Sequence, residues 1–234
     1  MKQLIPDLVS NALSTGRIIR IPVRTLGSKP KLRRILEEIL SNFGCREIIN
    51  PLFTCIMELL NNALKANYKN IYFENYHHLE NRHIDYPTAL KLFKLEISRE
   101  ERILQNKAVE MHMNAEILLR MLGDMFHFSV SNPVQMTADE YLNIMTKIEV
   151  AQNCSNLTDY FLKNQDDPFQ EGAGLGIVLI LIILKSLGGG RENLSIRSEN
   201  NCTVASIILP LNNSTLQAYR KNTAEMHLLT RHSV

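Results

Sequence analysis

The apolar and polar positions of this chain change period several times along its length. Residues 17–25 alternate and predict a short strand, and Pro22 places that strand at a sheet edge. Residues 28–44 begin with a serine cap and a first-turn proline, repeat apolar side chains at helical spacing and end at a glycine. A second helical pattern covers about 48–67. We therefore expect a strand followed by two helices.

The middle of the chain predicts two strands and a long helix. Residues 70–76 and 92–98 have the composition of strands and are separated by a polar loop. Residues 101–122 contain no glycine or proline and carry apolar side chains at helical spacing, so they predict a helical insert. This insert is either a packing element or a dimerisation or partner-binding element, and the sequence alone leaves both open.

The last part of the chain predicts alternating strands and helices. Residues 125–132 form a strand pattern that places Asn132 on one face with three apolar side chains. A capping box at Thr137–Glu140 begins a helix that should run to about Gln152, and residues 153–171 are polar. The remaining elements are a strongly apolar, buried helix at 174–187 and strands at 194–198 and 203–209.

Together these elements predict an α/β protein, a two-layer α/β sandwich whose mixed, mostly antiparallel sheet carries helices on one face. With 234 residues, of which 45% are hydrophobic, the chain is long enough for one sizeable core. We expect one domain at 17–211, an N-terminal extension at 1–16 and a C-terminal tail at 212–234 with a short helix.

The longest apolar run, 177–184, is too short to span a bilayer, and no signal-peptide pattern opens the chain. These features predict a cytoplasmic protein without a membrane anchor. The net charge of +2 gives no reason to expect nucleic acid. Cations do gather before the first acid of the helix at 28–44, and such a run is either a solvated face or a docking surface for an acidic partner protein. It comprises Arg17, Arg20, Arg24, Lys29, Lys31, Arg33 and Arg34.

Cysteine and histidine positions do not predict a metal site. The 4 cysteines have no paired spacing typical of zinc or redox motifs. His77, His78 and His83 fall in a polar segment without a carboxylate or cysteine at ligand spacing, so we expect a solvated loop.

The clearest candidate chemistry lies on the helix at 48–67. Glu58, Asn62 and Lys65 are spaced by four and three residues, so a carboxylate, an amide and an ammonium share one helix face. Apolar residues cover the other sides. Such a face either is simply solvated or meets a ligand that needs hydrogen bonds and a cation, for which a phosphate with magnesium is suitable.

A glycine-rich segment offers a second half for such a site. Gly172, Gly174 and Gly176 alternate directly before the apolar helix. Glycines let the backbone approach a ligand closely, and the free N–H groups of the following helix favour an anion. Each element is weak alone, but the two in this order are specific.

In this combination the chain resembles the GHKL nucleotide-binding superfamily, which includes gyrase, heat-shock-ninety chaperones, sensor histidine kinases, anti-sigma-factor serine kinases and MutL. The resemblance covers about 17–211 and rests on 58–66, 172–177 and the Thr203–Pro210 strand. Its order of elements is most similar to the free-standing anti-sigma-factor kinases. It implies that the cofactors are ATP and Mg²⁺ and that 153–171 form a lid.

The resemblance also implies roles for single residues. Asn62 would coordinate the magnesium ion, Lys65 would contact phosphate, and Glu58 would act as the catalytic base that polarises a water or hydroxyl nucleophile. The alternative for Glu58 is that it only holds a water or caps a neighbour. The remaining cofactor-binding residues implied are Asn132, Gly172, Gly174, Leu175, Gly176 and Thr203.

The chain departs from the family at the adenine site. The usual Asp-x-Gly-x-Gly is replaced by a segment in which Asn132 takes the place of the aspartate and both glycines are missing. An asparagine can still accept from an adenine amino group and donate to a ring nitrogen. What is lost is the charge-assisted part of that contact and the backbone freedom of the following loop.

Two functions from different classes follow as hypotheses. The first is an ATP-binding regulatory protein kinase or ATPase of histidine kinase-like type, which acts in signalling on or through a partner protein. For this hypothesis a single chain and a homodimer are both open. The second is a non-catalytic GHKL-like interaction module with weak or no nucleotide binding. Glu58 with Asn62 favours the first, and the missing glycines favour the second.

Overall fold

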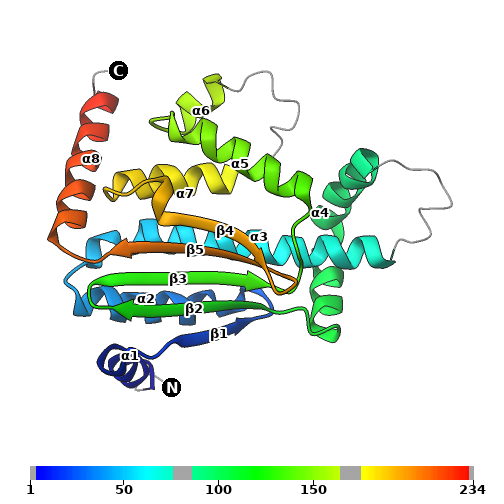
Figure 1. Cartoon of the computed structure of the whole chain (residues 1–234), viewed down its shortest axis with the longest axis horizontal. Coiled ribbons are helices and arrows are strands. Elements are labelled where there is room, and N and C mark those ends of the chain that lie inside the picture. The colour runs from blue at the N-terminus through cyan, green and yellow to red at the C-terminus, as the bar shows by residue number, and fades with distance from the viewer. Residues whose placement is uncertain (1–3, 76–85, 164–174, 232–234) are drawn as a thin grey trace.

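A computed structural model describes residues 4–75, 86–163 and 175–231 of the chain. One five-stranded sheet has the order β1-β2-β3-β5-β4, and all its pairings are antiparallel (Figure 1). Its strands are β1 (Ile19–Val23), β2 (Ala115–Leu122), β3 (Met125–Asn132), β4 (Leu194–Glu199) and β5 (Cys202–Pro210). The predicted two-layer α/β sandwich is confirmed.

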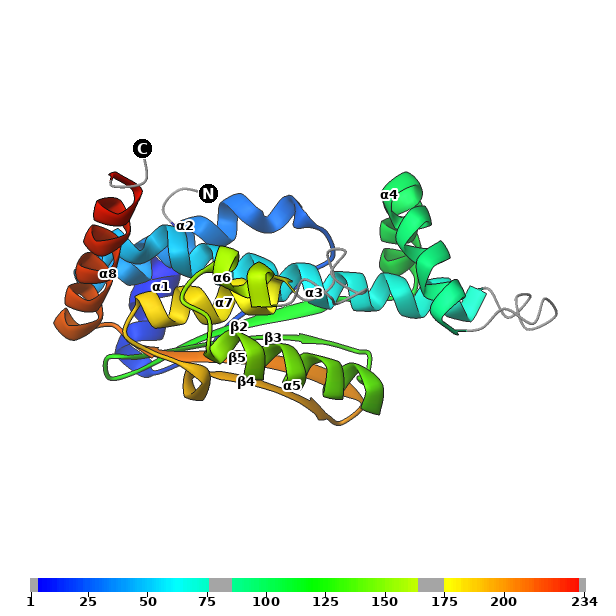
Figure 2. The same ribbon diagram turned by 90° about the horizontal axis from the view of Figure 1, so that it is seen from above.

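Helices α2, α3 and α7 lie on one side of the sheet (Figure 2). The described helices are α1 (Leu4–Thr15), α2 (Lys29–Asn42), α3 (Ile49–Asn75), α4 (Tyr86–Glu110), α5 (Ala138–Gln152), α6 (Leu157–Lys163), α7 (Leu175–Ser186) and α8 (Asn213–Arg231). Short 3-10 turns at Leu26–Ser28, Arg46–Ile48 and Arg191–Asn193 connect some of these elements. None of the described helices has both the length and the apolar character needed to cross a membrane.

Alternate side chains of β3 pack against the helices, as predicted. Phe126, Phe128 and Val130 of β3 are fully buried or nearly so, and they face the helix layer together with Asn132. Pro22 lies in β1, which is an edge strand as expected. Helix α5 begins with the predicted capping box, in which Thr137 and Glu140 bond to each other's backbone N–H groups.

Three predicted elements are wrong in whole or in part. Residues 70–75 belong to α3 and residues 92–98 to α4, so neither forms a strand; the last residue of the first predicted strand, 76, lies outside the described residues. Ile71 and Tyr72 are adjacent and both buried, which a helix packed on two sides allows and a half-exposed strand does not. The ring of Tyr72 packs against that of Phe93 of α4, with their centroids 5.3 Å apart.

The predicted helix at 101–122 is correct as far as Glu110, where α4 ends, and wrong beyond it, because residues 115–122 form β2. His112 adopts a positive φ of 56°, which a helix interior does not allow. Beyond it, pairing with β1 and β3 in the middle of the sheet overrides the helical propensity of the leucine-rich segment.

Both expected terminal segments form helices that pack on the domain. Val9 of α1 is fully buried in the core. Helix α8 is longer than the short helix expected and contacts α7. Arg220 on α8 donates to Glu47 at 2.9 Å, and Thr215 donates to the Pro210 carbonyl at 2.8 Å.

Lys185 of α7 ties the end of α5 to the helix layer. Its ammonium donates to the carbonyls of Ala151, Gln152 and Cys154 at 3.1, 2.5 and 2.9 Å. These groups lie at the C-terminal end of α5, where carbonyls lack helical partners and a cation is favoured.

Replacement of Lys185 by Met should lower the free energy of unfolding by about 1–2 kcal/mol, because three carbonyls, two of them part-buried, would lose a charge-assisted donor. Chemical denaturation measures this change. Lys221→Met on the exposed side of α8 is the control and should change stability by less than about 0.5 kcal/mol. An equal loss of stability in both variants would contradict the stabilising role of the Lys185 hydrogen bonds.

The opposite face of the sheet, seen in Figure 1, has no described helix across it. His127 of β3 lies on this face and pairs in register with Arg120 of β2. Burial lowers the pKa of His127 below its usual 6.5, and the charges of Arg120 and Arg197 lower it further.

As the pH falls below 6.5, the unfolded chain should take up a proton at position 127 before the folded chain does. Stability is therefore lost between 6.5 and the lower folded pKa, and no further change comes from this group below that pKa. His127→Gln should flatten this part of the stability profile, measured by thermal unfolding across the acid range. A profile of unchanged slope would contradict the shift.

Candidate functional site

Helix α3 presents the predicted polar stripe. Glu58 is half-buried, whereas Asn62 and Lys65 are exposed. Their neighbours Leu59, Leu60, Ala63 and Leu64 are buried in the core. Burial of the apolar sides therefore fixes the rotation of α3 about its axis and directs the three polar side chains away from the core.

The two distant segments of the predicted site meet at Glu58 and Gly176. Gly176 is the second residue of α7, and a methyl group in place of its hydrogen would overlap Glu58 Oε2. The Cδ and Cβ atoms of Glu58 would lie 3.4 and 3.6 Å from that methyl carbon. The carboxylate thus lies against the first turn of α7, where backbone N–H groups are free of helical partners. A Cβ at position 176 would therefore require the Glu58 carboxylate to shift.

The polar stripe of α3 continues to Lys69, which forms an ion pair with Glu140 of α5. Glu140 also accepts from the Thr137 N–H at 2.9 Å, so the ion pair fixes the start of α5 against α3. Burial lowers the pKa of Lys69 from its usual 10.5, while the neighbouring carboxylate favours the charged ammonium.

Two further predicted residues are cross-strand neighbours. Asn132 ends β3 and pairs in register with Thr203 of β5. The Thr203 hydroxyl donates to the Val134 carbonyl at 2.6 Å, and the Ser198 hydroxyl accepts from the Met136 N–H at 3.3 Å. Side chains of β5 and β4 therefore hold the loop that follows Asn132, which contains no glycine.

Asn132 is connected to α3 through Asn67. The Asn132 amide donates to Asn67 Oδ1 at 3.3 Å, and the Asn67 amide donates to the Met113 carbonyl at 3.0 Å. Both side chains are buried, with exposed fractions of 3% for Asn132 and 0% for Asn67. Helix α3 thus contacts Gly176 through Glu58 and Asn132 through Asn67.

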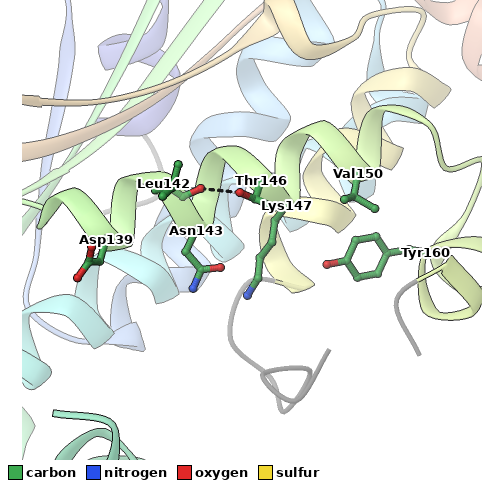
Figure 3. Close-up of a pocket in the computed structure, with 7 residues that line it drawn as sticks. All are labelled: Asp139, Leu142, Asn143, Thr146, Lys147, Val150 and Tyr160. Carbon is green, nitrogen blue, oxygen red and sulfur yellow. Dashed lines mark hydrogen bonds between the residues drawn. The ribbon is translucent and has the colours of Figure 1, made fainter. Parts of the chain in front are cut away.

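A separate pocket of about 420 Å³ lies on α5 and α6. Figure 3 shows its side chains projecting from one side of α5, with Tyr160 of α6 beside them. It is lined by Asp139, Leu142, Asn143, Thr146, Lys147, Val150 and Tyr160. None of the described residues that the sequence predicted for the site lines this pocket.

Part of the predicted site lies outside the described residues, namely Gly172 and Gly174, and so does the histidine group at 77–83. Leu175 is the first residue of α7. Within the described ranges, no group of three or more His, Cys, Asp or Glu side chains could hold a metal ion. A magnesium ion that is held mainly by phosphates and waters needs only one or two protein oxygens, and Asn62 can supply one.

Sequence reasoning missed Asn67 and Lys69. The spacing of four and three that joins Glu58, Asn62 and Lys65 extends by four to Lys69, so the same rule could have found it. Asn67 gave a different signal, because it is a single amide on the apolar side of the helix next to Tyr68. A buried polar group of this kind needs a partner.

Comparison with known proteins does not assign the chain to a family. No family model matches the chain, and no solved structure matches it. An uncharacterized protein of Treponema pallidum (strain Nichols) is similar, with 27% identity over 179 residues that make up 76% of this chain and 34% of that protein. The chain therefore spans about a third of the length of the curated relative that it matches.

The contact between Glu58 and Gly176 predicts that the effect of Gly176→Ala on stability changes sign when the Glu58 side chain is removed. Gly176→Ala should destabilise the protein, because the methyl group displaces the Glu58 carboxylate. In a Glu58→Ala background the same change should stabilise it by up to about 1 kcal/mol, since alanine is the better helix former. The coupling, of about 1 kcal/mol or more, is measured by denaturant unfolding of the four proteins. Additive effects would contradict the contact.

Proposed function

We propose that this chain binds magnesium-ATP in the manner of the GHKL superfamily and acts as a regulatory protein kinase or ATPase. The observation that carries the proposal is the packing of Glu58 against Gly176, because it joins the acidic-amide segment and the glycine segment in space. The described residues fit the ligand. An exposed amide, an exposed ammonium and a half-buried carboxylate share one helix face.

Positive charge beside Glu58 also supports the proposal. Lys65 and the first turn of α7 supply positive charge at the phosphate end.

In the proposed reaction Glu58 is the general base. Its carboxylate takes the proton of a water or protein hydroxyl as that oxygen attacks the terminal phosphorus, and the bond to the leaving ADP breaks. Asn62 would hold the magnesium ion, which would supply positive charge against the phosphates.

The proposed partner is a second protein. Arg24, Lys29, Lys31 and Arg34 are exposed around the start of α2. The first turn of α2 contains no acid, and Ser28 makes no side-chain cap. Cations at this end oppose the helix dipole, which favours an acidic partner surface. A homodimer stays a prediction.

The loop after Asn132 favours a second candidate, the non-catalytic interaction module. Hydrogen bonds from Thr203 and to Ser198 hold this loop, and it has none of the glycines that would let it adapt to a nucleotide. In this alternative the fold is kept for partner binding alone.

ATP with magnesium should raise the thermal stability of the protein, by about 2.7 kcal/mol at one hundred times the dissociation constant. Glu58→Ala should reduce turnover by about 10²–10⁴-fold and leave nucleotide binding largely intact. Thermal unfolding and release of phosphate, or its transfer to a partner, measure the two effects.

Glu74→Ala is the matched control, since Glu74 is an exposed acid on the same helix and should not affect turnover. Equal turnover in Glu58→Ala would remove Glu58 as the base. No thermal shift at millimolar ATP would favour the interaction module.

A further inference from the structure

Helix α5 leaves much of its surface uncovered by the described part of the chain. Of its 15 residues only Ile148 and Ala151 are fully buried, and both belong to the core. The pocket of about 420 Å³ follows another side of this helix. Large exposed apolar side chains gather on α5 and α6, a pattern typical of interaction surfaces. They are Tyr141, Leu142, Phe161 and Leu162.

Three polar residues of the pocket form a row along α5. Asp139, Asn143 and Lys147 follow one another at intervals of four residues, so they lie on one face of the helix. Figure 3 shows all three side chains extending from the same side of α5. This α5 row reads anion, amide, cation, with Asn143 midway between two opposite charges.

The α5 row is complementary to its own reverse. When a second α5 lies antiparallel against the first, with a two-fold axis at Asn143, Asp139 of each copy faces Lys147 of the other. The two Asn143 amides meet on the axis and can pair, because an amide both donates and accepts. A purely acidic partner would be repelled by Asp139, and a purely basic one by Lys147. The order of charges therefore fits a second copy of this chain.

Apolar contacts arise in the same arrangement. Leu142 and Val150 also line the pocket and are separated by the same eight residues as Asp139 and Lys147. Reversal of the second helix therefore brings Leu142 of one copy near Val150 of the other. Exposed ion pairs contribute little affinity, so the burial of these apolar side chains supplies most of it. The charges and Asn143 set the register, as single polar residues do between paired helices.

We propose that two copies of this chain form a dimer through the α5 row and the two apolar residues beside it. The pocket of one copy then receives α5 of the other, with Tyr160 of α6 as a further contact. Thr146 needs no partner across the interface, because its hydroxyl donates to the Leu142 carbonyl at 3.0 Å. None of these residues belongs to the proposed ATP site, so dimer formation and nucleotide binding are tested separately.

The unmodified chain provides the first test. Sedimentation velocity without nucleotide should show a dimer that is mostly formed at about 100 μM, given a dissociation constant of about 10 μM. Leu142→Glu should weaken dimerisation at least about tenfold. Because Leu142 is 66% exposed, this change leaves the core intact. A monomer at every concentration, or a dimer that Leu142→Glu does not weaken, would overturn the proposal and leave the pocket to another occupant.

Charge reversal within the α5 row provides the second test. Asp139→Lys gives the row two cations, and Lys147→Glu gives it two anions. Each variant alone should dimerise at least about tenfold more weakly, because like charges meet in both contacts. An equal mixture of the two should form a heterodimer, since the cations of one variant then face the anions of the other. A mixture that associates no better than either variant alone would overturn the proposal.

Glu110→Lys and Lys221→Glu are the matched controls, because they make the same changes of net charge at exposed positions on α4 and α8. Both should dimerise like the unmodified chain. A loss equal to that of the α5-row variants would show that net charge alone controls association, which would also overturn the proposal. If circular dichroism shows that an α5-row variant does not fold, the unmodified chain and Leu142→Glu decide.

Discussion

The burial of α3 is the constraint on which the rest of the structure depends. This helix packs against β3, α4 and α7, and its apolar sides fill the centre of the core. Once those sides are buried, the helix has a single rotation, and Glu58, Asn62 and Lys65 can only face away from the core. The contact with Gly176 follows from the same packing, because it brings the first turn of α7 against the polar stripe.

The polar contacts of α3 then position the elements around it. Lys69 holds the start of α5 through Glu140, and Asn67 holds the end of β3 through Asn132. Lys185 holds the other end of α5. These contacts are buried or half-buried, where a lost partner is more costly than in water. The candidate site is therefore built on elements that these contacts hold together.

The errors of sequence reasoning fall where local pattern and tertiary packing disagree. Residues 70–76 are rich in aromatic and β-branched side chains and predict a strand, yet 70–75 extend α3, and Tyr72 packs there against Phe93 of α4. Residues 115–122 have helical propensity, yet they form a central strand because the sheet supplies partners on both sides. Propensity is a weak preference, and long-range packing overrides it.

The sequence by itself determined the α/β class, the polar stripe of α3, the capping box of α5 and the buried face of β3, since each depends on the period of neighbouring side chains. Only the tertiary structure decided that Glu58 meets Gly176 and that Asn132 is held by Asn67. Those contacts join residues separated by 65 positions or more, and local pattern carries no information on which distant surfaces meet. The direction of an amide is likewise set by its partners and not by its own sequence neighbours.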